Sequence, residues 1–170
     1  MVRLEWSVSQ SVSVAEMDDE HVEIYQSLAA LQSLLAAEAP PSAIRKQCKD
    51  LGAQVEGHFG HEERLMRAAR YDAVRWHKRS HDHARKRVGQ YLSLLDEGDA
   101  SAAPALIEYL VSWLGDHTRL ADMMLGAFLR NHRLGLYKVS FRAGTRPVDA
   151  CEWVDSQGEK FNPVPTSRRG

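Results

Sequence analysis

The sequence predicts an all-α fold, an up-down-up-down four-helix bundle with a short C-terminal extension. Apolar residues recur every three or four positions in four long segments, which is the period of an amphipathic helix. Turn-like stretches separate these segments, among them APPS at residues 39–42 and EGDAS at residues 97–101. Helices of roughly 20 to 28 residues are about 30 to 40 Å long. Short connections make neighbouring helices antiparallel.

The first predicted helix covers about residues 13–38. Ser13 and Glu16 have the spacing of a capping box, in which side chains satisfy free backbone N–H groups at the start of a helix. An apolar row follows, consisting of Ile24, Leu28, Leu31 and Leu35. His21 stands at the head of that row, so we expect it to face the core.

The second predicted helix covers about residues 42–69 and contains the stretch HFGHEERLM. Its apolar row consists of Ile44, Cys48, Leu51, Val55, Leu65 and Ala69. The two positions that complete the row are His58 and Glu62, which stand where a bundle ordinarily has leucine. His61 and Glu63 lie off the row, so we expect them to face water.

The third predicted helix covers about residues 72–96, and the fourth follows EGDAS and runs to about residue 128. His77 and His81 fill two core positions in the row of the third helix, which otherwise has Val74, Ala84, Val88 and Leu95. The row of the fourth helix is Leu106, Leu110, Trp113, His117, Leu120, Met124 and Phe128. His83 falls off its row, and His132 lies beyond the last turn. Five histidines and one glutamate thus occupy inward positions across four helices.

We expect residues 1–133 to form the bundle and residues 134–170 to form the extension. LYKVSF alternates like a strand and CEWVD could pair with it as a short β-ribbon, whereas the end, PVPTSRRG, is typical of disorder. The extension is either a docking element for a protein partner, whose identity the sequence does not give, or a cover for exposed bundle surface.

Composition excludes several function classes. The chain has 22 basic and 23 acidic residues, and a formal net charge of -1 argues against binding to nucleic acid or to an anionic membrane. No apolar run approaches the roughly 18 residues of a membrane helix, and no secretory signal is visible. Cys48 and Cys151 form no CxxC pattern. We therefore expect a reduced, cytoplasmic protein.

The inward polar residues indicate a metal site. Each buried polar group without a partner costs roughly 1 to 3 kcal/mol, so six could cost on the order of 10 kcal/mol, comparable to the stability of a whole domain. Hydrogen bonds among the six are one solution, and cations in the core are the other. Five imidazoles are too many for one tetrahedral zinc. Two ions sharing a carboxylate are economical, while spacing alone leaves iron, manganese, copper and zinc open.

These residues resemble the hemerythrins, specifically the bacterial single-domain form, over about residues 4–130. The resemblance rests on MDDEH ending at His21, HFGHEERLM, HKRSH, WLGDHTRLAD and Trp6 ahead of the first helix. It implies a cofactor of two iron ions in an oxo- or hydroxo-bridged di-iron centre. One iron would be held by His77, His81 and His117, and the other, with an open position for O2, by His21 and His58. Glu62 and Asp122 would bridge the two irons.

Of the seven ligand assignments, that of Asp122 depends most on the resemblance. It follows His117 by five residues, which is about 140° around an ideal helix. Periodicity by itself would place the side chain in solvent.

The resemblance also suggests an O2 pocket lined by Phe59, Trp113, Leu114 and Thr118, with Ile24 or Tyr25 from the first helix. For each aromatic or aliphatic residue the alternative is ordinary core packing. The family commonly has isoleucine where this chain has Thr118. Its hydroxyl would admit water or hydrogen-bond bound oxygen, unless its methyl group merely fills the space.

The function that follows is reversible O2 binding for oxygen storage, transport or delivery, without catalysis. One alternative is a sensor of O2, NO or redox state that signals through a partner of the extension. A second is a di-iron peroxidase or oxidase, although no additional acid–base residue stands on a core row.

Overall fold

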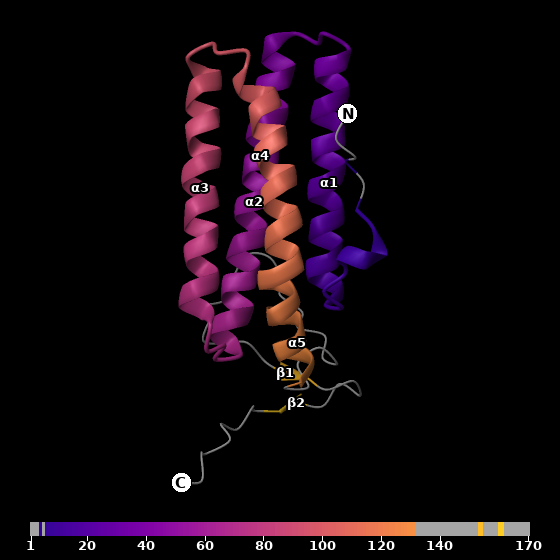
Figure 1. Ribbon diagram of the computed structural model, residues 1–170, viewed down its shortest axis with the longest axis vertical. Coiled ribbons are helices and arrows are strands. Elements are labelled where there is room, and N and C mark those ends of the chain that lie inside the picture. Colours follow the sequence, from indigo (N-terminus) through magenta and orange to yellow (C-terminus); the bar gives the residue numbers. More distant parts are fainter. Residues whose placement is uncertain (1–3, 5, 132–152, 155–159, 162–170) are drawn as a thin grey trace.

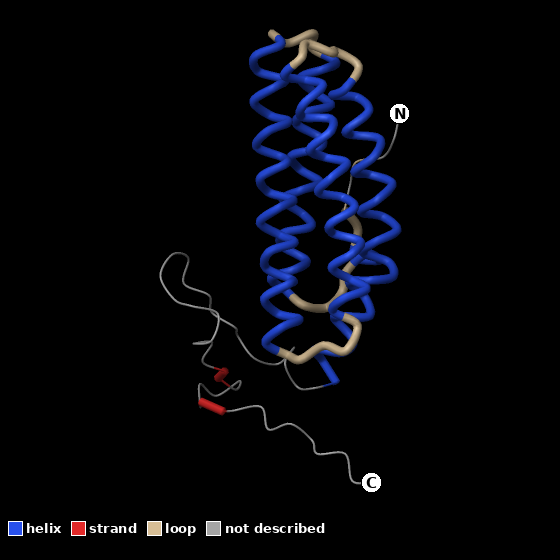
Figure 2. The backbone as a smooth tube through the Cα atoms, turned by 90° about the vertical axis from the view of Figure 1, so that its left-hand side faces the viewer, coloured by secondary structure: helices blue, strands red, loops and turns tan. Residues whose placement is uncertain are grey.

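The computed structural model describes residue 4, residues 6–131 and two short strands at residues 153–154 and 160–161. The elements are η1 (Val8–Gln10), α1 (Ala15–Ala36), α2 (Pro41–Ala68), α3 (Val74–Asp96), α4 (Ala102–His117), η2 (Thr118–Asp122), α5 (Met123–Asn131), β1 (Trp153–Val154) and β2 (Lys160–Phe161). α1, α2, α3 and the continuous rod α4–η2–α5 lie side by side, joined by short loops (Figures 1 and 2). Each helix packs on the next, and α4 closes the ring against α1. The predicted all-α four-helix bundle is confirmed.

The start of α1 differs from the prediction. Ser13 has a positive φ of 58° and lies outside the helix, which begins at Ala15 without a side-chain cap. Asp18 instead accepts hydrogen bonds from the Ser11 hydroxyl at 2.6 Å and the Val12 N–H at 2.8 Å. The predicted capping box is wrong because this carboxylate binds the incoming segment one turn inside the helix.

The apolar row of the fourth helix shifts by one residue at η2, which is a π-helical turn. The predicted core residues Leu120 and Met124 are 56% and 46% exposed, whereas the residues that follow each of them, Ala121 and Leu125, are buried. A π turn carries one more residue than an α turn. The downstream row therefore advances by one position, a change that a constant 3.6-residue period does not include.

The core consists of two apolar clusters with a polar layer between them. The larger cluster includes Ile24, Leu28, Leu31, Cys48, Leu51, Val55, Leu106, Leu110 and Leu114. The smaller cluster includes Val12, Val14, Met17, Leu65, Met66, Tyr71, Leu125 and Leu129. In α1, His21 lies between Met17 and Ile24, and in α2, His58 and Glu62 lie between Val55 and Leu65. The inward histidines are thus brought to one level of the bundle.

The segment before α1 closes the smaller cluster by packing against α5. Val12 and Val14 are buried there, and Arg130 donates a hydrogen bond to the Val12 carbonyl. Gly126 lies opposite the same carbonyl, and a Cβ at this position would overlap the Val12 oxygen. Close approach of the two backbones therefore requires glycine.

Only part of the predicted C-terminal extension lies within the described residues. β1 lies in the predicted strand CEWVD and pairs with β2 in antiparallel register, Trp153 with Phe161 and Val154 with Lys160. The other predicted strand, at residues 136–141, and the end PVPTSRRG lie outside the described residues, and the domain boundary at 133 stays a prediction.

No helix among the described residues has the length and apolar content needed to cross a bilayer.

We predict that Gly126→Ala destabilises the protein by about 1 to 3 kcal/mol, because the new methyl group must displace the Val12 backbone. Gly89→Ala is the matched control, since nothing lies within 4 Å of a Cβ there. That change should stabilise α3 by up to about 1 kcal/mol through helix propensity. Urea unfolding of both variants measures the difference, and equal stabilities would contradict the close contact.

Candidate metal centre

Seven polar side chains converge in the layer between the two apolar clusters. Each is at most 5% exposed. They come from all four rods of the bundle and are His21, His58, Glu62, His77, His81, His117 and Asp122. They form two groups that could each hold a metal ion, one of five residues and one of four, and Glu62 and Asp122 belong to both.

The first group is compact. The Nε2 atom of His117 lies 3.0 Å from that of His77 and 3.1 Å from that of His81. Glu62 Oε2 lies 3.2 Å from His77 Nε2 and 3.1 Å from His81 Nε2. Asp122 Oδ1 lies 3.1 Å from the Nε2 atoms of both His77 and His117. Adjacent ligands of an octahedral ion with bonds of about 2.1 Å are about 3.0 Å apart, so these separations match five positions of such an ion.

The second group uses the remaining oxygens of the two carboxylates. Asp122 Oδ2 lies 3.4 Å from His21 Nε2, and Glu62 Oε1 lies 3.7 Å from His58 Nε2. Each carboxylate therefore turns one oxygen toward each group. This is the arrangement of carboxylates that bridge two cations.

Hydrogen bonds within the layer leave several of its atoms unsatisfied. Within the described part of the chain, His21 Nε2, His58 Nε2, Glu62 Oε1 and both Asp122 oxygens have no hydrogen-bond partner. They approach other polar atoms, but not in the alignment that a hydrogen bond needs. Buried acceptors that point at a common centre are costly unless a cation occupies it. The donor set, five imidazoles and two carboxylates, suits iron, manganese, copper or zinc.

Three of the histidines are oriented from behind through Nδ1. Glu20 accepts from His58 Nδ1 at 2.9 Å, Ser80 Oγ lies 3.0 Å from His117 Nδ1, and Glu63 Oε1 lies 3.4 Å from His81 Nδ1. A proton on Nδ1 leaves the Nε2 lone pair free to face the centre.

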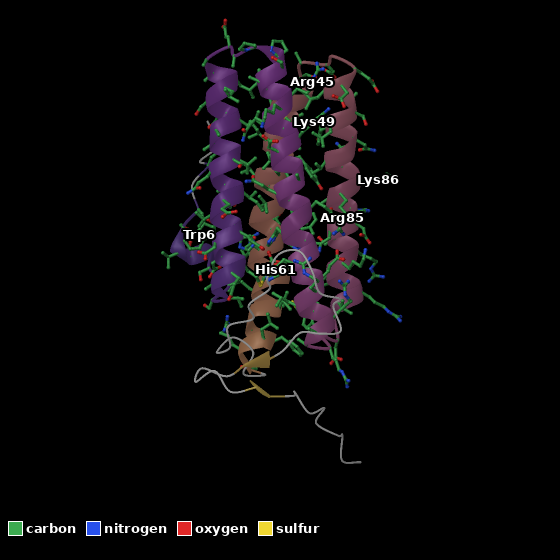
Figure 3. All side chains as sticks on the ribbon, turned by 180° about the vertical axis from the view of Figure 1, so that it is seen from behind. Trp6, Arg45, Lys49, His61, Arg85 and Lys86 are labelled. Atoms are coloured by element: carbon green, nitrogen blue, oxygen red, sulfur yellow. The ribbon has the colours of Figure 1, made fainter. Side chains whose placement is uncertain are left out.

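His61 and Glu63 were expected to face water, and that expectation is wrong, since each is 7% exposed. His61 Nδ1 lies 2.8 Å from Glu20 of α1. Arg85 of α3 donates a hydrogen bond of 2.7 Å to Glu63. Figure 3 shows where His61 and Arg85 lie on the bundle. Polar partners on neighbouring helices bury these side chains beside the apolar row. Only the pairing of Glu63 with a cation across the interface could have been suspected from charge.

Without metal, the layer holds protons in place of cations. Burial lowers the pKa of His58, but Glu62, Glu20 and Asp122 outweigh burial and raise it to about 9. Burial likewise lowers the pKa of His77, while Asp122 and Glu62 raise it to about 9. Burial raises the pKa of Glu62, but the facing histidines bring it down to about 2. Burial also raises the pKa of Asp122, but His117, His21 and His77 hold it well below its usual range, so both carboxylates favour the anionic form.

η2 explains how Asp122 reaches the layer. An ideal α-helix would turn it about 140° away from His117. The π turn from Thr118 to Asp122 brings the carboxylate round to the same face, 3.1 Å from His117 Nε2. Residue spacing alone gave no sign of this turn, because a constant 3.6-residue period does not include it.

Two of the predicted pocket residues stack on histidines of the first group. Phe59 stacks on His81 with ring centroids 4.2 Å apart, and Trp113 stacks on His117 at the same distance. Leu114 is fully buried, and Thr118 is buried with no hydrogen-bond partner for its hydroxyl among the described residues. Ile24 is buried, and the hydroxyl of Tyr25 accepts a hydrogen bond from Gln10. Their role in O2 binding stays a prediction.

Comparison with known proteins agrees with this geometry. The model of one family, described as the hemerythrin HHE cation binding domain, matches residues 12–129. A bacteriohemerythrin of Stenotrophomonas maltophilia is 27% identical over 143 residues, 79% of this chain and 92% of that protein. Myohemerythrin-1 of Phascolopsis gouldii is 28% identical over 117 residues, 69% of this chain and 87% of that protein. A bacteriohemerythrin of Pseudomonas paraeruginosa is 27% identical over 122 residues, covering 72% and 78%. No solved structure matches significantly.

We predict opposite pH responses for metal-free and metal-loaded protein. Because folding raises the pKa of His58 and His77 to about 9, the metal-free native state binds protons more tightly than the unfolded chain. Its stability should be highest near pH 6.5 and fall by on the order of 3 kcal/mol by about pH 9. His81, whose pKa is lowered, acts in the opposite sense only below about pH 6.5.

In the metal-loaded protein, protons compete with the cation, so its stability should hold or rise over the same range. Urea unfolding at several pH values, with iron and after chelation, separates the two responses. Parallel curves would show that these histidines do not bind a cation.

Proposed function

The chain belongs to the hemerythrin HHE cation-binding family, and from this premise we propose that it is a non-haem di-iron protein that binds O2 reversibly. The observation that supports the proposal best is the orientation of the Glu62 and Asp122 carboxylates. Each carboxylate directs one oxygen toward each histidine group. The two irons, when bound, would supply the electrons for reversible binding of O2.

The proposed ligands are unequal between the two irons. His77, His81, His117, Glu62 and Asp122 would give five protein donors to the first, and His21, His58, Glu62 and Asp122 would give four to the second. The second iron would therefore keep more room for an external ligand. Glu20, Ser80 and Glu63 would hold three of the imidazoles in the orientation that binding requires.

The surroundings support binding of a small apolar gas. Phe59, Trp113 and Leu114 would exclude water from the centre, and Ile24 would do so from α1. Slow entry of water favours retention of O2 over loss of electrons from the iron. We propose storage, transport or delivery of O2 as the role, in the cytoplasm and without catalysis, with NO as a second ligand. A sensor role through the extension remains the alternative.

Metal analysis tests the proposal directly. Purified protein should contain two iron ions per chain and show a visible absorption band that appears with O2 and disappears when O2 is removed. His81→Ala should lose iron and the band, while His83→Ala, which changes an exposed histidine two residues away, should keep both. Stoichiometric zinc, or a spectrum that does not respond to O2, would rule the proposal out.

We predict that Thr118→Ile slows spontaneous oxidation of the oxygenated protein several-fold. The buried Thr118 hydroxyl has no partner among the described residues, so it offers water a site near His117. Thr118→Val separates the causes, because it removes the hydroxyl and nearly keeps the volume. Decay of the O2-dependent band gives the rate, and equal or faster decay in both variants would mean that the threonine only fills space.

A further inference from the structure

The net charge of the chain conceals a strong separation of charge between two helices. α1 carries five acidic residues and no lysine or arginine, whereas α3 carries six basic residues and two acidic ones. In the ring of helices, α2 and α4 lie between α1 and α3. The bundle is thus acidic over residues 16–23 of α1 and basic over residues 75–87 of α3, on the opposite side of the ring. A chain that is nearly neutral as a whole still presents a cationic surface to a partner.

Three cations on the outer side of α3 are available to a partner. Arg75, Arg79 and Lys86 are exposed and follow one another by four and seven residues, which places them on one helix face. No ion pair or hydrogen bond joins their side chains to any of the residues that the structure describes. Figure 3 shows Lys86 directed away from the bundle, whereas Arg85 turns toward α2.

The other cations of α3 have partners within the fold. Lys78 binds Asp82 at 2.6 Å, and Arg85 binds Glu56 at 2.6 Å and Glu63 at 2.7 Å. Arg87 donates to Gln90 and lies over the ring of Tyr91. Among the residues that the structure describes, the α3 lysine and arginine side chains without an ion pair or hydrogen bond therefore all lie on the outer face.

This face lies directly behind the candidate metal centre. The inner side of α3 carries His77 and His81, so one helix, about 10 Å across, separates the cations from these imidazoles. Trp76 precedes His77 and is 40% exposed, with its ring centroid 6.3 Å from that of the histidine. An exposed indole beside a buried metal ligand offers a short route for an electron.

We propose that the outer face of α3, defined by Arg75, Trp76, Arg79 and Lys86, docks an acidic one-electron carrier protein that keeps the irons ferrous. The proposal rests on the function proposed above, because a reversible O2 carrier stops working when its irons become ferric. Each encounter would transfer one electron from the reduced carrier, so two encounters would be needed to supply the two electrons that a ferric pair would take up at the site held by His77 and His81.

The surface suits an acidic protein better than a nucleic acid. The three cations span about 17 Å, and tight nucleic-acid binding typically uses about 6 to 10 phosphate contacts. The acidic first part of α1, residues 16–23, repels an extended polyanion but turns a compact acidic protein toward α3. A small, charge-steered interface also gives the fast, weak encounters that electron transfer needs.

Charge reversal tests the docking surface. The probe is a plant-type [2Fe–2S] ferredoxin, an acidic one-electron carrier, whose binding in the oxidised form is titrated at low salt. Arg75→Glu with Arg79→Glu should weaken binding at least tenfold and remove its salt dependence. Lys46→Glu with Lys49→Glu changes the net charge equally at the far end of α2 and should leave binding within twofold. An equal loss of ferredoxin affinity in the two double variants would overturn the proposal. So would tighter binding of duplex DNA than of ferredoxin at the α3 face.

Electron transfer is then followed in protein whose irons have been oxidised by air. With reduced ferredoxin, the α3 pair should slow reduction at least tenfold, and Trp76→Leu should lower the limiting rate without changing the salt dependence of binding. Reduction by dithionite should be unchanged in all variants. Reduction by ferredoxin at the wild-type rate, both in the Arg75→Glu, Arg79→Glu variant and in Trp76→Leu, would refute electron transfer through this face. Iron content and the O2-dependent band, measured on the same samples, show separately whether the proposed function fails, since binding of oxidised ferredoxin requires neither.

Discussion

The fold depends on one constraint, the burial of seven inward-facing polar groups at a single level of the bundle. These groups occupy core positions in α1, α2, α3 and the continuous helix α4–η2–α5. The apolar interior is consequently divided into two clusters. The histidines partly neutralise Glu62 and Asp122, but several acceptor atoms among the described residues keep no partner. The layer is thus unfavourable by itself and becomes favourable once positive charge lies between its two groups. The metal-free bundle is therefore less stable than one with an apolar layer at this level, and cation binding would offset that loss of stability.

Periodicity was sufficient for the fold and for six of the seven residues, because an inward histidine occupies the position of a missing leucine. It failed where tertiary structure alters local geometry. η2 moved Leu120 and Met124 to the surface and turned Asp122 inward, and only the family resemblance had indicated that aspartate. His61 and Glu63 are buried by partners on other helices, Glu20 and Arg85, which no pattern within α2 reveals. The start of α1 differs for the same reason, since Asp18 binds the preceding segment.

The polar residues behind the ligands extend the site toward the surface, and they do so unevenly. His58, His81 and His117 are supported through Nδ1, whereas among the described residues the Nδ1 atoms of His21 and His77 have no hydrogen-bond partner. Arg85 joins Glu63 to Glu56 and lies over the ring of Phe59, so one side chain links a ligand partner, a candidate pocket residue and the solvent-facing side of α2. Such networks fix side-chain orientation more than they add stability, because charged pairs lose much of their attraction to desolvation.

Asp122 also affects when the centre can form during synthesis. It is the last of the seven groups along the chain, and it contributes an oxygen to both halves of the layer. A nascent chain on the ribosome that has not yet released this residue has neither half complete. The turn that directs Asp122 inward continues into α5, which is fastened to the segment before α1 through Gly126 and Arg130. Completion of the candidate site is thereby coupled to contact between early and late parts of the chain, a contact of high sequence separation that forms late in synthesis.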